Sequence, residues 1–241
     1  CEAEMDNTSY YSQKTKFLLS VILGFLSLAL SPLGFIAHVG EININITWPL
    51  LFTIIAALAF GKWYGFIAGL SGGALFPFYL WPNEGISNVG TAILFLLIYF
   101  ILGASSTGDC IFKKVRKPFG VVVALALNIF MISIYYSFLF EPLLSINSVF
   151  WQKETIFSLP KEILRSFALK NIFNLSVLTF IALTLFHIDS VRNMLAMNQA
   201  PEVKSNGIIA LLTTMIVIAT WFVITKLGNI FLKKNLQLHN E

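Results

Sequence analysis

The sequence predicts an all-α protein, a polytopic transmembrane bundle of six to seven membrane helices. Hydrophobic residues make up 57% of the chain and charged residues only 12%, well below the share in soluble domains. The mean hydropathy is +0.79, and apolar segments of near-spanning length alternate with short polar or basic connections. This pattern sets the soluble-enzyme classes aside. It also argues against nucleic-acid binding, because the basic residues flank the apolar segments.

A single transmembrane helical domain is expected over residues 17–227. Residues 1–16 form a polar N-terminal segment, and residues 228–241 form a C-terminal tail or the start of a linker. The two cysteines, Cys1 and Cys110, do not predict a structural disulfide, because Cys110 adjoins a basic loop that we place in the cytoplasm.

The first helix is expected at about residues 17–35. It carries small residues at Ser20, Gly24 and Ser27, at spacings that suit helix packing in a membrane. Isoleucine and asparagine then alternate over residues 42–46, and this period of two predicts an extended or strand-like loop.

The second and third helices form a glycine-rich hairpin over residues 48–88. Gly61, Gly65, Gly69 and Gly73 recur every four residues, so on a helix they lie along one nearly axial stripe without side chains. We assign these glycines to helix packing, with the first helix as the expected partner, because bare backbone permits close approach. A glycine face left open for a ligand is the alternative.

Tryptophan–proline pairs mark both ends of this hairpin. Trp48-Pro49 opens the first segment and Trp81-Pro82 closes the second. Tryptophan favours the membrane–water interface, so both pairs are expected at one membrane surface and Gly61 at the other. The segment 48–60 is short for a span of about 20 residues. Its outer end should therefore lie below the surface and leave a recess.

The remaining helices follow at about residues 89–102, 119–140, 172–186 and 207–227. Within the long outer connection before the helix at 172–186, residues 159–170 predict a short amphipathic helix, because Leu159, Ile163 and Phe167 recur every four residues. We expect this helix to lie in the outer interface and to act as a lid.

The charge distribution predicts the topology. Residues 113–117 hold four basic residues in five positions and are therefore expected in the cytoplasm. Loops 38–47, 81–88 and 141–171 are then external. Seven full spans place the C-terminus outside, although lysines flank the last apolar segment. Either one segment does not fully cross, or the tail is external.

Polar and aromatic residues of the outer loops are the candidates for ligand binding, because small-molecule sites combine apolar walls with a few convergent polar groups. Together with one intramembrane residue, they are Glu41, Asn43, Trp48, Trp81, Asn83, Glu84, Asn88 and Asn128. Asn128 is costly in an apolar helix unless it is paired, and an inter-helix hydrogen bond is the alternative to ligand contact. Asn171 and Asn174 are interpreted as helix caps.

No catalytic residue, metal site or cofactor is predicted. The sequence shows no nucleophile–base pair, phosphate loop, paired catalytic carboxylates or His/Cys metal spacing. His38 and Glu41 are two possible metal ligands without a third nearby. The chain is therefore expected not to be an enzyme.

The hairpin resembles a known family. Residues 48–51 (WPLL), 57–65 (ALAFGKWYG) and 69–73 (GLSGG) resemble the substrate-binding S component of energy-coupling factor vitamin transporters. A similar block occurs in the N-terminal membrane input domains of bacterial sensor histidine kinases and diguanylate cyclases. The continuation over residues 75–83 (LFPFYLWPN) looks closer to the sensor group. The strong part of the resemblance covers residues 48–103.

The resemblance implies a small helical bundle in the bacterial cytoplasmic membrane that binds a small molecule from the outer side. The leading hypothesis is a sensory input domain that signals to a cytoplasmic output domain beyond this chain and forms a homodimer in the bilayer. The alternative is a stand-alone S component that delivers a vitamin-like solute to the energising module of a transporter. A purely structural membrane anchor is the third possibility. S components typically have six helices, whereas seven apolar segments occur here.

Overall fold

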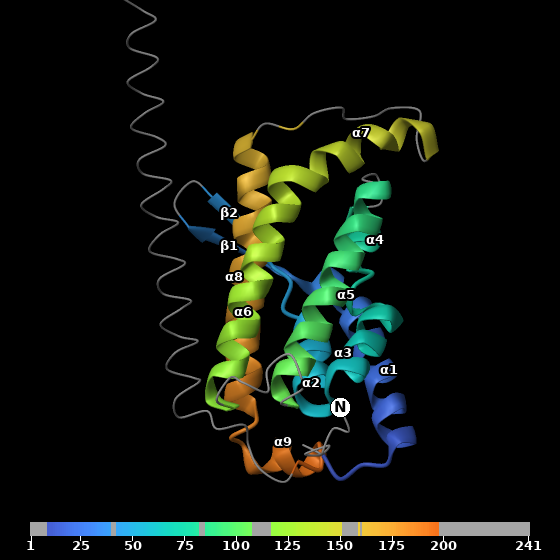
Figure 1. The fold of residues 1–241 in the computed structure, drawn as a ribbon, viewed down its shortest axis with the longest axis vertical. Helices are drawn as coiled ribbons and strands as arrows, with labels where there is room; N and C mark the ends of the chain where they lie inside the picture. The colour runs from blue at the N-terminus through green and yellow to red at the C-terminus, as the bar shows by residue number, and fades with distance from the viewer. Residues whose placement is uncertain are drawn as a thin grey trace, which may run out of the picture.

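The computed structural model describes residues 9–39, 42–81, 85–107, 117–150, 159 and 161–197. Over these ranges the chain is a helical bundle with one small β-hairpin, in agreement with the predicted class (Figure 1). The main elements are α1 (Gln13–Ala29), β1 (Phe35–Val39), β2 (Ile42–Ile46), α2 (Leu50–Phe60), α3 (Lys62–Ala68), α4 (Phe76–Leu80), α5 (Ile86–Ser106), α6 (Lys117–Ile134), α7 (Phe140–Phe150), α8 (Lys161–Leu185) and α9 (Asp189–Met194).

Within the described ranges, three helical stretches are long and apolar enough to cross a membrane. They are Ile86–Ser106, Gly120–Ile146 and Ile163–Leu185. The helix α2 is apolar but shorter, with 11 residues, as the sequence predicted. Together with the composition, these helices indicate a membrane protein.

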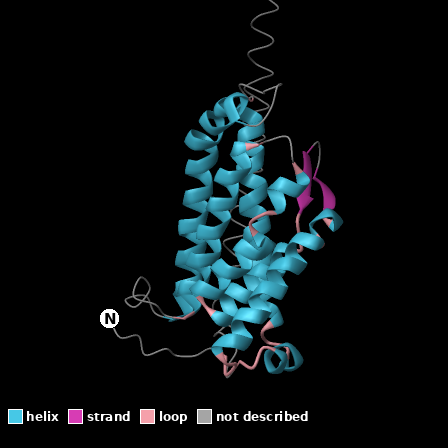
Figure 2. Cartoon of the chain, turned by 90° about the vertical axis from the view of Figure 1, so that its right-hand side faces the viewer, coloured by secondary structure: helices cyan, strands magenta, loops and turns pink. Residues whose placement is uncertain are grey.

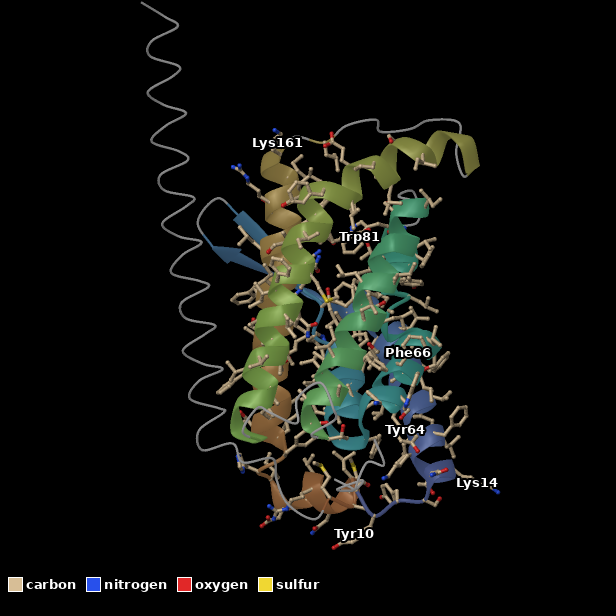
Figure 3. The ribbon with its side chains drawn as sticks, in the orientation of Figure 1. Tyr10, Lys14, Tyr64, Phe66, Trp81 and Lys161 are labelled. Carbon is tan, nitrogen blue, oxygen red and sulfur yellow. The ribbon has the colours of Figure 1, made fainter. Side chains whose placement is uncertain are left out.

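The long helices run alternately between two ends of the bundle (Figure 1). We call the end at which Trp81 and Lys161 lie the upper end, and the end at which Tyr10 and Lys14 lie the lower end (Figure 3). The chain passes from α5 down to the lower end, returns through α6, and descends again through α8 to α9. The basic residues 113–116, the segment 207–227 and the C-terminal tail lie outside the described residues.

The short helix α2 is the centre of the bundle. Nine of its eleven residues are buried, and it packs against α1, α3, α5 and α8. A helix that is apolar on all sides is suited to such a position. It ends at Gly61, whose φ of +102° is a conformation that side chains rarely adopt, and the chain reverses there into α3.

The glycine stripe packs against α2 and α5, so the expectation that it packs against the first helix is wrong. A Cβ atom on Gly65 would lie 2.6 Å from Ala57 Cβ and 2.9 Å from the carbonyl oxygen of Tyr99. A Cβ atom on Gly69 would lie 2.7 Å from Leu96 Cδ2. Four-residue steps drift by about 40° around a helix, so the stripe turns gradually from one neighbour to the next.

The two ends of the stripe also face these neighbours. A Cβ atom on Gly61 would meet Thr107, just after α5, and one on Gly73 would meet Thr53 of α2. The third predicted helix is not continuous, because a π-helical turn at Gly69–Gly73 separates α3 from α4. The buried Tyr99 hydroxyl donates a hydrogen bond to the Gly73 carbonyl oxygen at 3.0 Å and so supplies a donor to a backbone acceptor of this irregular turn.

Helix α1 occupies a different face of the hairpin. Its small residues Ser20, Gly24 and Ser27 are buried, as their spacing predicted. A Cβ atom on Gly24 would collide with Ala68 and Ser71. The contact therefore uses small residues of the hairpin that lie between the stripe glycines.

Helix α8 is one continuous helix of 25 residues, so the predicted break between a surface helix at 159–170 and a membrane helix at 172–186 is wrong. The sequence from Lys161 to Leu185 contains neither glycine nor proline, and nothing interrupts its backbone hydrogen bonding. Asn171 and Asn174 lie in the middle of this helix and are buried, so their interpretation as caps is also wrong.

Two irregular elements flank the upper half of the bundle. Strands β1 and β2 pair antiparallel, which places a strand where alternation predicted one, and the hairpin stands beside the helices (Figure 2). The predicted helix 119–140 continues further, through a π-helical turn at Tyr135–Leu139 into α7. Helix α7 bends across the upper end (Figure 1).

The N-terminal segment closes the lower end. Ser9 Oγ donates a hydrogen bond to the Leu195 carbonyl oxygen at 2.8 Å, and the Tyr10 N–H donates to the Ala196 carbonyl oxygen at 2.8 Å. Residues that are almost two hundred positions apart are thus joined next to α9.

The glycine contacts predict an order of stabilities. Gly65→Ala should lower the free energy of unfolding in detergent by about 1–3 kcal/mol, because its new methyl group meets rigid neighbours, a backbone oxygen and an alanine. Gly69→Ala should cost less, since Leu96 Cδ2 is the end of a side chain that can rotate. Leu70→Ala is the control, because Leu70 is exposed. Thermal unfolding measures all three, and an equal or reversed order of the glycine variants would contradict this packing.

Candidate ligand-binding site

A small pocket lies towards the upper end of the bundle, where α4, α5, α8 and the bend between α6 and α7 meet (Figure 3). Its apolar wall includes Phe76, Phe140 and Phe167. The centres of water-sized molecules have about 20 Å³ available in it, which is room for one ordered water. The pocket is therefore almost filled by its own side chains.

A cation and an aromatic ring meet at this pocket. Lys170 Nζ lies 4.2 Å from the centroid of the Trp81 ring, which is a close cation–π contact. The Trp81 ring in turn lies edge-on to Phe76, with 6.2 Å between centroids. Both Trp81 and Lys170 line the pocket, so it combines a positive charge with aromatic surface.

Asn88 contributes a buried amide from the first turn of α5. Its Nδ2 donates a hydrogen bond to the Trp81 carbonyl oxygen at 2.7 Å. Its Oδ1 is buried and has no hydrogen-bond partner among the described residues. Leaving such a group unsatisfied costs about 1–3 kcal/mol. The pocket therefore offers a hydrogen-bond acceptor to a ligand or a water molecule.

Hydrogen bonds tie the pocket walls together. Asn171 Nδ2 on α8 donates to the Tyr136 hydroxyl at 2.7 Å. The neighbouring Tyr135 hydroxyl donates to the Ser87 carbonyl oxygen at 3.0 Å and lies 3.1 Å from Thr91 Oγ1 on α5. The two tyrosines belong to the π-helical turn, a type of distortion that is frequent at functional sites.

The structure brings together only part of the predicted set. Trp81 and Asn88 lie side by side in the pocket. Trp48 does not line it, because its Nε1 donates to the Leu33 carbonyl oxygen at 2.9 Å and its ring packs near Phe52. Trp48 thus holds the base of the β-hairpin and does not line this pocket, and its predicted role in ligand binding stays a prediction. The predicted residues Glu41, Asn83 and Glu84, as well as the side chain of Asn43, lie outside the described part of the structure.

Asn128 lies on α6, away from the pocket. It is fully buried, and neither of its amide atoms has a hydrogen-bond partner among the described residues. The inter-helix hydrogen bond that the sequence offered as an alternative is therefore absent there. Asn128 is a buried polar group, on a helix apolar and long enough to cross a membrane, whose burial cost is not offset within the described structure.

The predicted lid is part of a fixed helix. Phe167 lines the pocket and Leu159 packs against the core, but Ile163 is 39% exposed. Because these residues precede and form the first turns of the continuous α8, a separate hinged helix does not exist.

Three important pocket residues were missed in the sequence. The sequence pattern predicted a helix boundary at Lys170 and Asn171, and it assigned no role to Tyr136 within the segment 119–140. Helical continuity was the available signal: Phe167, Lys170, Asn171 and Asn174 follow at helical spacings on one face of α8.

Comparisons of the chain with family models, curated proteins and solved structures gave no match. The resemblance of residues 48–103 to S components and sensor domains stays a prediction from the sequence. Among the described residues there is also no group of three or more His, Cys, Asp or Glu side chains that could hold a metal ion.

A substitution of Asn128 tests whether its buried amide has no hydrogen-bond partner, as the described residues indicate. Asn128→Leu should leave the free energy of unfolding unchanged or raise it by about 1 kcal/mol, because it removes a buried polar group that has no partner. Asn88→Leu, in contrast, should destabilise the protein, because it removes a hydrogen bond and leaves the Trp81 carbonyl oxygen without the donor on Asn88. Thermal unfolding of both variants in one detergent makes the comparison. A clear loss of stability for Asn128→Leu would show that its amide is bound to something.

Proposed function

We propose that this chain is a membrane-embedded domain that binds a small organic anion in the pocket beside Trp81. The observation that carries this proposal is the Lys170 ammonium group, held 4.2 Å from the Trp81 ring at a pocket inside a membrane bundle. A charged side chain among membrane helices is costly and marks a functional site by default.

The lining also defines the chemistry of the ligand. Phe76, Phe140 and Phe167 favour an apolar or aromatic body. Lys170 favours a carboxylate or another anionic group on that body, and Asn88 Oδ1 accepts a hydrogen bond from a hydroxyl or N–H group of the ligand. A small amphipathic acid with one additional hydrogen-bond donor matches the chemistry of this lining.

Binding requires the pocket to widen. Small-molecule sites usually have volumes of a few hundred cubic ångströms, whereas this pocket holds about 20 Å³. Helix α4 has only five residues and is joined to α3 through the π-helical turn at Gly69–Gly73. We infer that α4 and Trp81 move outward to admit the ligand, and that the present structure is the contracted state.

The membrane arrangement belongs to the same proposal. We assign membrane crossings to α1, α2, the α3–α4 segment, α5, α6 and α8, and a seventh to residues 207–227. The basic residues 113–117 place the lower end in the cytoplasm, so the pocket opens outward. The bacterial cytoplasmic membrane is proposed from the resemblance alone.

The path of α8 supports a sensory role. The helix carries Lys170 and Asn171 at the pocket and continues without a break to the lower end, where α9 follows. A movement at the pocket can thus be transmitted to the cytoplasmic side, where the rest of the chain begins. In the alternative role as an S component, the same pocket would release its ligand to a transporter.

Ligand binding is tested by thermal stability in detergent, with a panel of small aromatic and aliphatic carboxylic acids and their neutral amides. A compound present at 100 times its Kd stabilises a protein by about 2.7 kcal/mol. At least one acid should raise the melting temperature of the wild type, and its amide should not. Lys170→Gln and Trp81→Leu should each abolish the rise.

The matched control is Lys161→Gln, since Lys161 lies on the same helix but is exposed at its end. Its response to the acid should equal that of the wild type. If no acid in the panel shifts the wild type, or if Lys170→Gln responds like the wild type, the proposed anion site does not exist.

The topology is tested with single cysteines at the two ends of α8. In a background without native cysteines, Lys161→Cys should react with an impermeant maleimide in intact cells, and His187→Cys only after the membrane is disrupted. Both positions are exposed, and α8 is about 37 Å long, enough to separate them across a bilayer. The opposite labelling pattern would reverse the orientation.

A further inference from the structure

A second and wider hollow lies at the lower end of the bundle, between the start of α1 and α3. It is an open groove with room of about 460 Å³, far larger than the pocket beside Trp81. Its lining consists of Gln13, Lys14 and Phe17 from α1, and of Trp63, Tyr64 and Ile67 from α3. Lys14 and Tyr64 both lie in this lower part of the molecule (Figure 3).

One wall of the groove is exposed and aromatic. Trp63 is 60% exposed and Phe17 is 53% exposed. The Trp63 ring is held edge-on by Phe100 and Phe66, with centroid distances of 5.3 Å and 6.4 Å. Trp63 therefore presents a fixed apolar surface outward, as tryptophan does at a membrane interface. Leu70, two turns further along the hairpin, is also exposed and extends this apolar path towards the middle of the bundle.

The other part of the groove is polar and positive. Lys14 is exposed, and Gln13 and Tyr64 supply an amide and a hydroxyl group. None of the described residues that line the groove is acidic. At the same end, Asp189 is paired with Arg192 on α9. The charge that the groove itself presents is thus that of a single lysine.

We propose that this groove binds one anionic phospholipid. Its phosphate-bearing headgroup lies at Lys14, Gln13 and Tyr64, and one acyl chain follows Phe17, Trp63 and Ile67 along the outside of the bundle. An amphipathic lipid fits better than a soluble anion, because the apolar wall is wide, exposed and continuous with the lipid-facing surface. The site is independent of the pocket beside Trp81, since the two share no residue.

The charge of the lower leaflet supports this occupant. The basic residues 113–117 assign the lower end to the cytoplasmic side, and the cytoplasmic leaflet carries the anionic lipids that attract lysine and arginine at its surface. At the lower end of the bundle, Lys14 matches the anionic headgroup of such a lipid, and the exposed aromatic rings beside it match the acyl chain.

The experiment uses the fluorescence of Trp63 as its readout. The full chain is reconstituted in vesicles of phosphatidylcholine and phosphatidylglycerol in which bromine is placed on the acyl chains of one lipid at a time. The difference between the wild type and Trp63→Phe gives the signal of Trp63. Brominated phosphatidylglycerol should quench this signal more than brominated phosphatidylcholine at the same mole fraction.

Two charge variants show whether the preference for phosphatidylglycerol depends on Lys14. Lys14→Gln should lose it, so that both brominated lipids quench Trp63 equally, whereas Lys161→Gln at the upper end should keep it. Both lysines are exposed, so neither substitution should destabilise the fold. Equal quenching by the two lipids in the wild type, or an undiminished preference in Lys14→Gln, would overturn the proposal.

Discussion

The close approach of backbone to backbone at the lower end of α2, α3 and α5 is the constraint on which the rest of the structure depends. A Cβ atom on Gly103 of α5 would lie 2.6 Å from backbone atoms of Gly61 and Lys62. On α3, a Cβ atom on Gly65 would lie 2.6 Å from Ala57 Cβ of α2 and 2.9 Å from the Tyr99 carbonyl oxygen of α5. At these positions nothing larger than the Ala57 methyl group separates the three helices, as small residues allow inside a membrane, where dispersion contacts replace the hydrophobic effect. A short, fully buried α2 is compatible with a stable bundle because this contact holds it on two sides.

The same contact explains why the pocket lies at the other end. Helix α5 is held against the hairpin at Gly103, and the Tyr99 hydroxyl fixes the π-helical turn through the Gly73 carbonyl oxygen. Beyond this turn the hairpin has only the five-residue α4 before Trp81, and the facing wall is itself bent by a second π-helical turn at Tyr135–Leu139. Tight packing below and irregular, aromatic packing above divide the bundle into a rigid part and a part in which a small rearrangement can open space. The pocket beside Trp81 lies in the second part.

The sequence was most informative where spacing alone determines the structure. The short α2, the small-residue face of α1 and the strand at Ile42–Ile46 follow from length and periodicity. The sequence failed to predict which helix packs against the glycine stripe. Four-residue glycine spacing indicates that another helix approaches closely, but it does not distinguish α1 from α5. The sequence also failed at Lys170 and Asn171, because polar residues within an apolar run predicted a boundary between two helices. In the structure, Lys170 contacts the Trp81 ring and Asn171 donates a hydrogen bond to Tyr136, and such tertiary contacts have no signature in the local sequence.

The two buried asparagines show how similar polar groups have different consequences. Asn88 and Asn128 are both fully buried, and both have an amide atom without a partner among the described residues. Asn88 lines a pocket, so its desolvation cost, about 1–3 kcal/mol, is relieved when a ligand or a water molecule donates to Oδ1. In the proposed site, relief supplied by a ligand and not by a water molecule would add to the binding free energy and favour ligands with a donor over those without one. Asn128 does not line this pocket, so its cost is the same in the free and bound states and contributes nothing to affinity. In the proposed site, the position of the amide relative to the cavity, and not its burial, therefore decides which asparagine can contribute to recognition.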